Sequence, residues 1–293
     1  MGSSPIGRAK IMKIHITSGD YFYIVEDLIR GLISTLKEDG HKVTFGFNTL
    51  DNDAININIA STAISLDQFD SVRDKLIHYN LEQIVPTNFH GTSQNHIAEL
   101  KIGFVWDYSR INVNNLLTYQ INAEWVPIGY DPEMTFIKSG SSTSLDIDVL
   151  FYGYETDRRI KVLNKIKDLG LNLVTSNIIN PQDTPWNNFY RNQLIARSKV
   201  VLNMHAYDDN IIFEMVRVSH LLANKKAVVS EDSGIPGYLK QTVLAGELEE
   251  LPTLCKLLVK NPEYRLTQET KGFEIFKKYK YSDEINNALG KIL

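Results

Sequence analysis

The sequence predicts an α/β protein built from two Rossmann-like, doubly wound domains that face each other across a cleft. Runs of β-branched residues alternate with segments of helical periodicity along most of the chain, a pattern typical of parallel sheets covered by helices. The alternation is broken once, between residues 125 and 144, by a turn rich in Pro and Gly and a tract of small polar residues. Such a break is typical of a domain boundary, and 293 residues is about the length of two domains.

The first domain is expected over residues 12–140, because residues 1–5 read like a leader added for expression. A β-branched run at residues 13–17 is followed by apolar residues at helical spacing over 24–36, and a strand is expected at 41–46. This strand–helix–strand order has about the length that a parallel crossover requires.

The rest of the first domain carries shorter apolar runs. Two further strands are expected at residues 81–86 and 101–106. The alternation of Asn and Ile between residues 51 and 65 fits either a strand or an irregular loop. We therefore expect an open, mostly parallel sheet with covering helices.

The second domain is expected over residues 146–277 and repeats this alternation. Its expected strands cover residues 148–153, 171–174, 199–205 and 227–231. Helices are expected between them at residues 158–169, 189–197 and 208–223. An Asp-Asp-Asn triplet would cap the third helix at its start. The remainder is helical by its spacing and ends in an amphipathic tail over residues 278–293.

Composition limits the partners. The 31 Lys and Arg stand against 35 Asp and Glu, and this balance disfavours nucleic acid or an anionic membrane as a partner without excluding a local basic groove. No apolar run approaches the roughly 20 residues that span a bilayer, so no membrane span is expected. The one cysteine, Cys255, stands in an apolar helical run and is expected in the core. A single cysteine fits a reducing compartment, and we expect a cytoplasmic protein.

Familiar catalytic and metal motifs are missing. The first strand is not followed by G-x-G-x-x-G, and the phosphate-loop, H-E-x-x-H, G-x-S-x-G and EF-hand patterns are also absent. Two Asp-x-Asp triplets, at residues 51–53 and 146–148, have the spacing that holds Mg²⁺ against a diphosphate. Acidic residues in a loop and at the solvated start of a strand explain them better, so we assign no metal site.

Ligands of open α/β sheets bind beyond the carboxyl ends of the strands, where helix N-termini present free N–H groups. In the second domain, Gly153 ends such a strand and would permit close backbone approach. Arg158 and Arg159 follow at a helix start and would clamp a phosphate in a bidentate manner. A solvated helix start with outward charges explains the two arginines equally well.

A second cluster follows the strand at residues 199–205, which ends in His205. Glu214 and Arg217 are three residues apart, so they would share one face of the first turns of a helix. The carboxylate suits sugar hydroxyls and the guanidinium suits a diphosphate, whereas the alternative is an intrahelical ion pair worth a few tenths of a kcal/mol. Glu231 ends the next strand and would either cap a ligand or form a turn, with the turn favoured.

The first domain offers candidate acids and bases at its own strand ends. Ser18, Gly19 and Asp20 close the first strand, His90 follows the expected strand at residues 81–86, and Asp107 follows Trp106. Each would face the cleft, where Asp20, His90 or Asp107 could act as a general base. Taken singly, each is more often a turn former or a satisfied polar residue.

The motifs of the second half resemble those of GT-B glycosyltransferases, especially CgeB-like and family-1-type members. The matching segments are residues 148–153 with Arg158 and Arg159, then 199–205, 213–217 and 224–231, together with residues 126–131 and the tail from 271. The Glu-x₇-Glu pattern of many retaining members is not reproduced, because Ser219 falls where the second glutamate would stand. This departure leaves open the ribose-binding role of Glu214 and the choice between retention and inversion.

The resemblance implies a metal-independent glycosyltransferase without a cofactor, which moves a sugar from a UDP- or GDP-linked donor to an acceptor hydroxyl. The tail would cross back to the first domain, where Ser18, Gly19 and Asp20 would bind the acceptor. The donor-binding residues would be Gly153, Arg158, Arg159, His205, Glu214, Arg217 and Glu231. Arg217 and one or both of Arg158 and Arg159 would stabilise the departing diphosphate. The alternatives are a two-lobed binding protein without catalysis and a sugar-nucleotide epimerase of the same fold.

Overall fold

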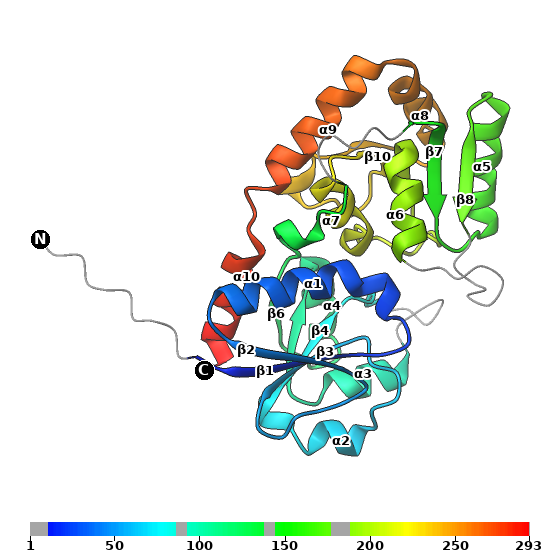
Figure 1. The fold of residues 1–293 in the computed structure, drawn as a ribbon. Coiled ribbons are helices and arrows are strands. Elements are labelled where there is room, and N and C mark those ends of the chain that lie inside the picture. The colour runs from blue at the N-terminus through cyan, green and yellow to red at the C-terminus, as the bar shows by residue number, and fades with distance from the viewer. Residues whose placement is uncertain (1–10, 86–92, 138–143, 177–187, 293) are drawn as a thin grey trace, which may run out of the picture.

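The computed structural model describes residues 11–85, 93–137, 144–176 and 188–292. Its strands form two parallel sheets, one in each half of the chain, with helices between the sheets (Figure 1). The expected leader and His90 lie outside the described residues, as does most of the polar tract between the two expected domains.

The first sheet is parallel throughout and has the strand order β2-β1-β3-β4-β5-β6. Its strands are β1 (Lys13–Ser18), β2 (Lys42–Phe47), β3 (Ile55–Ile59), β4 (Leu76–Asn80), β5 (Phe104–Asp107) and β6 (Ala123–Trp125). The alternation of Asn and Ile is therefore a strand, β3. The strand expected at residues 81–86 is wrong, because the fully buried run of β4 ends at Asn80 and the polar Glu82 and Gln83 follow in a loop.

Helices cover both faces of this sheet. Helix α1 (Phe22–Glu38) places an apolar stripe from Val25 to Leu36 against Ile14 and Ile16, since these residues recur at helical spacing. The other face carries α2 (Leu66–Asp70), α3 (Gln94–Leu100) and α4 (Arg110–Leu117). At the carboxyl ends of β4 and β5, His96 of α3 hydrogen-bonds Asn80 and Asn112 of α4 donates to Asp107.

The second sheet is also parallel, with the strand order β11-β10-β9-β7-β8. Its strands are β7 (Ile147–Tyr152), β8 (Leu173–Ser176), β9 (Ser198–Asn203), β10 (Ala227–Glu231) and β11 (Leu244–Gly246). Its helices are α5 (Asp157–Asp168), α6 (Asn188–Arg197), α7 (Met215–Ala223), α8 (Leu251–Lys260) and α9 (Pro262–Phe276). Successive residues of β7 and β9 enter different core clusters, because side chains alternate along a strand. Cys255 lies in the core of this half, as predicted.

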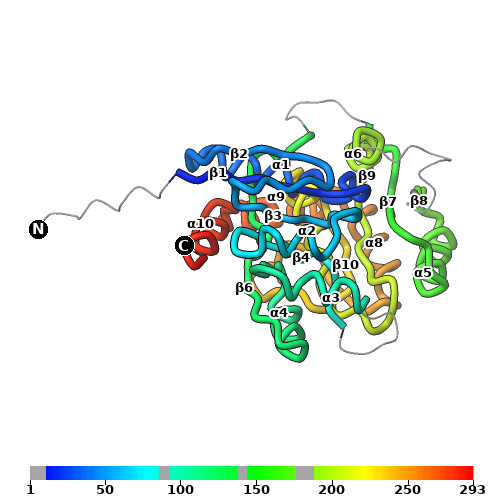
Figure 2. Tube along the Cα trace, turned by 90° about the horizontal axis from the view of Figure 1, so that it is seen from below, coloured from blue at the N-terminus to red at the C-terminus, as the bar shows by residue number. Residues whose placement is uncertain are grey.

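The C-terminal helix returns to the first half. After α9 the chain crosses over, and α10 (Tyr281–Ile292) packs against α1 (Figures 1 and 2). The amide of Tyr281 donates a 3.0 Å hydrogen bond to the carbonyl of Tyr130, which fixes the crossing. One apolar cluster contains residues of α1, α7 and both sheets, so the two halves share a core. Within the described residues, no helix combines the length and the apolar character needed to cross a membrane.

The helix expected over residues 208–223 begins later than predicted. Ile212 and Phe213 are buried in the shared core before the helix starts, and α7 begins only at Met215. Glu214 is therefore the N-cap residue rather than part of the first turn. This correction matters because Glu214 stands at the meeting point of the two halves.

Candidate functional site

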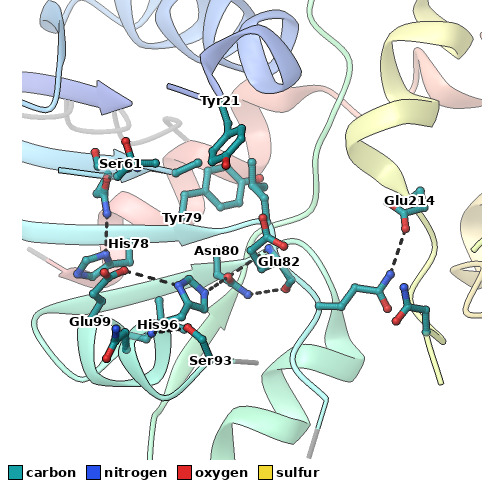
Figure 3. A pocket seen from close by; sticks show the side chains of 18 of the residues that line it. Tyr21, Ser61, His78, Tyr79, Asn80, Glu82, Ser93, His96, Glu99 and Glu214 are labelled. Carbon is teal, nitrogen blue, oxygen red and sulfur yellow. Dashed lines mark hydrogen bonds and ion pairs between the residues drawn. The ribbon is translucent and has the colours of Figure 1, made fainter. Parts of the chain in front are cut away.

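Two pockets meet at Glu82 and Glu214, between the strand ends of the two sheets. The larger has a volume of about 660 Å³, and we call it the acidic pocket because Glu82, Glu99 and Glu214 line it (Figure 3). The smaller has a volume of about 170 Å³, and we call it the cationic pocket because Arg191 and Arg217 line it. Glu82 and Glu214 line both pockets, and of the two pockets only the smaller is also lined by arginines.

The cationic pocket forms where the first turn of α1 faces the first turns of α7, and Ile24, Val25 and Tyr152 contribute to its wall. The Arg217 guanidinium lies 5.5 Å from the centre of the Tyr152 ring and donates a 2.7 Å hydrogen bond to the side-chain oxygen of Asn203. Its buried Nε has no partner within the described residues. A guanidinium with a free donor beside an aromatic ring suits a bound anion.

Gly153 makes room for Arg217. Its φ of +149° is a conformation that residues with a side chain rarely adopt, and a Cβ there would lie 3.3 Å from Nη2 of Arg217. The glycine thus allows the guanidinium to approach the end of β7. From the sequence, Gly153 was expected to let a ligand approach the backbone closely. In the structure, the group that lies close to it is the side chain of Arg217.

Glu214 connects the two halves. Its Oε1 accepts a 3.1 Å hydrogen bond from the side chain of Gln83, which follows β4, and lies 3.9 Å from Nδ1 of the buried His205. Burial raises the pKa of Glu214, but nearby His205 and Arg217 outweigh this effect and hold the pKa below its usual value. The group is therefore an ionised carboxylate at the entrance to both pockets. Glu214 and Arg217 bond to Gln83 and Asn203 rather than to each other, so the intrahelical ion pair is wrong.

Arg158, Arg159 and Glu231 form a network behind the pockets. Arg158 makes a bidentate pair with Glu231 and also bonds Asp208. Arg159 is buried and donates to the backbone carbonyls of Tyr154, Met204 and His205. Glu231 also accepts a 3.0 Å hydrogen bond from the amide of His205. These side chains line neither of the two pockets. Because the arginines bond Glu231, Asp208 and backbone carbonyls, the alternative of outward charges at a solvated helix start is wrong.

Asp107 is fully buried and acts on the acidic pocket through other residues. One carboxylate oxygen accepts from the amide of Ser109 and the side chain of Asn112, and the other accepts a 2.6 Å hydrogen bond from the side-chain nitrogen of Asn80. Burial raises the pKa of Asp107 to about 8, against these donors. Because no part of Asp107 is exposed, its expected contact with a substrate as a general base is wrong.

His96 is the residue that this network presents to the pocket. The amide nitrogen of Asn80 is committed to Asp107 and to the carbonyl of Glu82, so its oxygen faces Nε2 of His96 at 2.8 Å. This arrangement places a proton on Nε2, and Nδ1 lies 3.6 Å from the carboxylate of Glu99 (Figure 3). His96 was not among the residues expected from the sequence. The signal that could have indicated it is Ser93, a recognisable helix cap that places His96 in the first turn of α3.

Of the three expected acceptor-binding residues, two are buried and one is exposed, and none lines the acidic pocket. Ser18 is buried, and its hydroxyl has no partner within the described residues. A Cβ on Gly19 would lie 2.7 Å from the amide of Thr62, so this glycine lets the loops after β1 and β3 pack together. Asp20 is exposed, and it is the next residue, Tyr21, that lines the acidic pocket.

The Asp-x-Asp triplets lie away from both pockets. Asp51 pairs with Lys13 at 2.8 Å, Asp148 pairs with Lys199 at 2.6 Å, and Asp146 pairs with Arg197. Among the residues that the structure describes, no three His, Cys, Asp or Glu side chains gather as a set of metal ligands.

Two facing Rossmann-like domains with a C-terminal helix that returns to the first half define the GT-B fold. No protein-family model and no curated protein matches the chain. Solved structures do, and the first is AviGT4, a glycosyltransferase involved in avilamycin A biosynthesis, with 13% identity, a TM-score of 0.53, and coverage of 96% of this chain and 98% of that chain.

Two other matches have similar extents. A DNA-modifying β-glucosyltransferase has 15% identity and a TM-score of 0.57, over 96% of this chain and 99% of that chain. A trehalose-6-phosphate structure from E. coli, bound with UDP-2-fluoro glucose, has 10% identity and a TM-score of 0.62, over 96% of this chain and 98% of that chain. At these identities the likeness shows the fold.

Proposed function

We propose that this protein is a glycosyltransferase that moves a sugar from a nucleotide-diphosphate sugar to an acceptor hydroxyl. The observation that carries the proposal is the junction at Glu214, where a pocket with two arginines opens beside a larger pocket rich in carboxylates, amides and hydroxyls. A diphosphate leaving group needs the first environment and a hydroxyl-bearing acceptor needs the second.

In this proposal the diphosphate binds in the cationic pocket. Arg217 and Arg191 line it, and the N-terminal turn of α1 adds backbone N–H groups. Arg191 is already paired with the buried Asp27, whereas Arg217 retains a free donor, so Arg217 provides most of the stabilisation of the departing charge. The arginines take the place that a divalent metal has in other transferases, and we propose a metal-independent reaction without a cofactor.

Glu214 would bind the hydroxyl groups of the donor, and His205 would position its carboxylate from behind. The carboxylate of Glu214 is ionised and one quarter exposed, so it accepts hydrogen bonds from ribose or sugar hydroxyls at the junction. His205 is buried beside it and lines neither pocket, and its Nδ1, 3.9 Å from the carboxylate, makes no hydrogen bond within the described residues. Arg158 and Arg159 are not part of the proposed phosphate site, because their N–H groups donate to Glu231, Asp208 and backbone carbonyls.

The acceptor would bind in the acidic pocket, and we propose His96 as the base that takes its proton. Asp107 and Asn80 fix the orientation of the ring, and Nδ1 is left as the acceptor atom. Asp20 is the other described candidate for this role, but it is exposed and lies outside the pocket lining.

Several finer assignments belong to the same proposal. A UDP-linked hexose is the first donor to test and a GDP-linked one the second, because the similar β-glucosyltransferase has uridine diphosphoglucose as its substrate and the similar E. coli structure is bound with UDP-2-fluoro glucose. We propose residues 12–140 as the acceptor domain, residues 146–277 as the donor domain and residues 278–293 as the returning tail. The kinship to CgeB-like enzymes and the cytoplasmic location remain part of this proposal.

A thermal-shift panel of UDP, GDP, ADP, CMP and dTDP, with and without EDTA, tests the proposal. One diphosphate should raise the melting temperature by several degrees at about 100 times its Kd, and EDTA should not change the shift. The exposed Arg197, which pairs with Asp146 far from both pockets, offers a matched control, since Arg197→Ala should keep the full shift. No shift with any nucleotide would favour the two-lobed binding protein. Conversion of a donor to its epimer without transfer would favour the epimerase.

A further inference from the structure

We propose that the acceptor is a neutral, hydroxyl-rich molecule, a sugar or polyol that carries neither phosphate nor carboxylate groups. This inference rests on the proposed function, because it assumes that the acidic pocket receives the acceptor. It assigns the substrate class and makes Glu99 a residue that determines specificity.

The first argument is charge. Among the described residues that line the acidic pocket, the ionisable groups are carboxylates, histidines and tyrosines, with no Lys or Arg (Figure 3). Glu99 lines one end of the pocket and Glu214 the other, with Glu82 also in the lining. An anionic acceptor would meet repulsion from these carboxylates and would find no cation to offset the loss of its hydration. Phosphorylated sugars and nucleic acid therefore do not fit this pocket.

The second argument is hydrogen bonding. Asn58, Asn95, Ser61, Thr62 and Ser93 line the pocket with amides and hydroxyls. Such groups both donate and accept hydrogen bonds, and so do the hydroxyls of a sugar. The carboxylates add strong acceptors for hydroxyl protons without requiring a positive charge on the ligand.

The third argument is shape. The exposed Tyr21 and the loop residue Tyr207 bring aromatic rings to the pocket, one from each half of the chain. Aromatic faces pack against the apolar C–H faces of a sugar ring. A volume of about 660 Å³ also lies within the range of pockets for drug-sized ligands, which leaves room for more than one sugar ring.

Matched acceptors test this inference. Saturation-transfer NMR and nucleotide release from the donor selected by the thermal-shift panel would compare glucose, maltose and cellobiose with glucose 6-phosphate and glucuronic acid. We expect binding and glycosylation of at least one neutral sugar, and at least a tenfold lower kcat/KM for the charged partners. Equal or better use of a charged partner, or no binding of any neutral sugar, would overturn the inference. A nucleotide-dependent thermal shift in the same sample shows that the donor site, and with it the proposed function, survives such a result.

A charge reversal sharpens the test. Glu99 has a partly exposed side chain on α3, and Glu99→Lys places a cation where the wild type has a carboxylate. We expect this variant to lose use of neutral sugars and to lower the KM for glucose 6-phosphate by about tenfold, while the thermal shift with the nucleotide persists. Glu274→Lys on the exposed side of α9 is the control and should leave both values unchanged. Equal effects of the two variants would overturn the role of Glu99.

Discussion

The acidic and the cationic pocket share Glu82 and Glu214, but they come from different parts of the fold and differ in charge. The acidic pocket is built mainly from the carboxyl ends of the first sheet and from α3, which supply carboxylates and amides. The cationic pocket is built where α6 and α7 of the second half face α1, and its arginines come from those two helices. Each half therefore supplies most of the groups that set the character of one pocket, the carboxylates and amides of the first and the arginines of the second.

The two arginines also differ from each other. Arg191 is buried with Asp27, which neutralises it and ties α6 to α1. Arg217 has only the neutral side chain of Asn203 as a hydrogen-bond partner, and its Nε is left without one within the described residues. A partly buried cation whose Nε makes no hydrogen bond is stabilised when an anion binds, so Arg217 is the group that a ligand would complete.

The largest predicted loss of activity comes from a substitution in the acidic pocket. His96→Ala should reduce transfer by about 10²–10⁴-fold, the usual contribution of a general base, while the nucleotide still stabilises the protein. Kinetics of sugar transfer and a thermal shift measure the two halves separately. Added imidazole should restore part of the activity if His96 takes the proton.

The neighbouring Gln94 is the control for this prediction. It lies on the same helix, is exposed and does not line the pocket, so Gln94→Ala should transfer sugar at the wild-type rate. An unchanged rate in His96→Ala, or a loss without rescue that also removes the thermal shift, would contradict the proposed role.

Arg217→Ala should break the other pocket. Loss of a group that meets the charge of the leaving diphosphate lowers kcat by roughly 10–10³-fold, and here the nucleotide-dependent thermal shift should shrink as well. This double loss separates Arg217 from His96, whose removal spares nucleotide binding. If Arg217→Ala bound and transferred normally, the cationic pocket would not be the diphosphate site.

A pair of glycines tests whether the position of Arg217 matters. Gly153→Ala would place a Cβ 3.3 Å from the guanidinium, at a φ of +149°. Gly170 also has a positive φ, +73°, but a Cβ there meets nothing within 4 Å. Both variants should lose on the order of 1 kcal/mol or more of stability from backbone strain. Only Gly153→Ala should also raise the nucleotide Kd, by about tenfold, in a calorimetric titration, and equal Kd values would refute the argument.

Much of the fold follows from local sequence pattern. The buried runs of β9 and β10 and the periodicity of α1 and α5 were sufficient to predict both parallel sheets. Two errors arose where tertiary packing overrides local signals. Helix α7 begins only at Met215, because Ile212 and Phe213 are buried in the shared core. The strand expected at residues 81–86 is instead a loop after β4, in which Gln83 bonds Glu214 and the amide of Ile84 bonds the side chain of Asn112.

The site was predictable only in part. Strand ends and helix starts directed attention to Glu214, Arg217 and Gly153, which the structure brings together. The pairing of Arg158 with Glu231 spans 73 residues, and spacing along the chain carries no sign of it. For the same reason, the contact of Gln83 with Glu214, 131 residues apart, was not foreseen.

The smallest expected effect is a pH dependence of stability. Burial lowers the pKa of His78 and of His220 to about 4, so between about pH 4 and 6.5 the unfolded chain binds more protons and the free energy of unfolding rises with pH. Asp107 acts in the opposite sense, because burial raises its pKa in the folded state from the ordinary 3.8 to about 8, and its contribution to stability falls as the pH rises toward 8. Below pH 6.5 the two histidines change the free energy of unfolding more than the one carboxyl does, and above pH 6.5 the carboxyl dominates.

The free energy of unfolding, measured by urea unfolding, should therefore have a maximum between pH 6 and 7, with slopes on the order of 1 kcal/mol per pH unit on either side. Asp107→Asn should flatten the alkaline limb and steepen the acid limb, because Asp107 opposes the two histidines between about pH 4 and 6.5. An alkaline limb that survives in this variant would show that another group causes it.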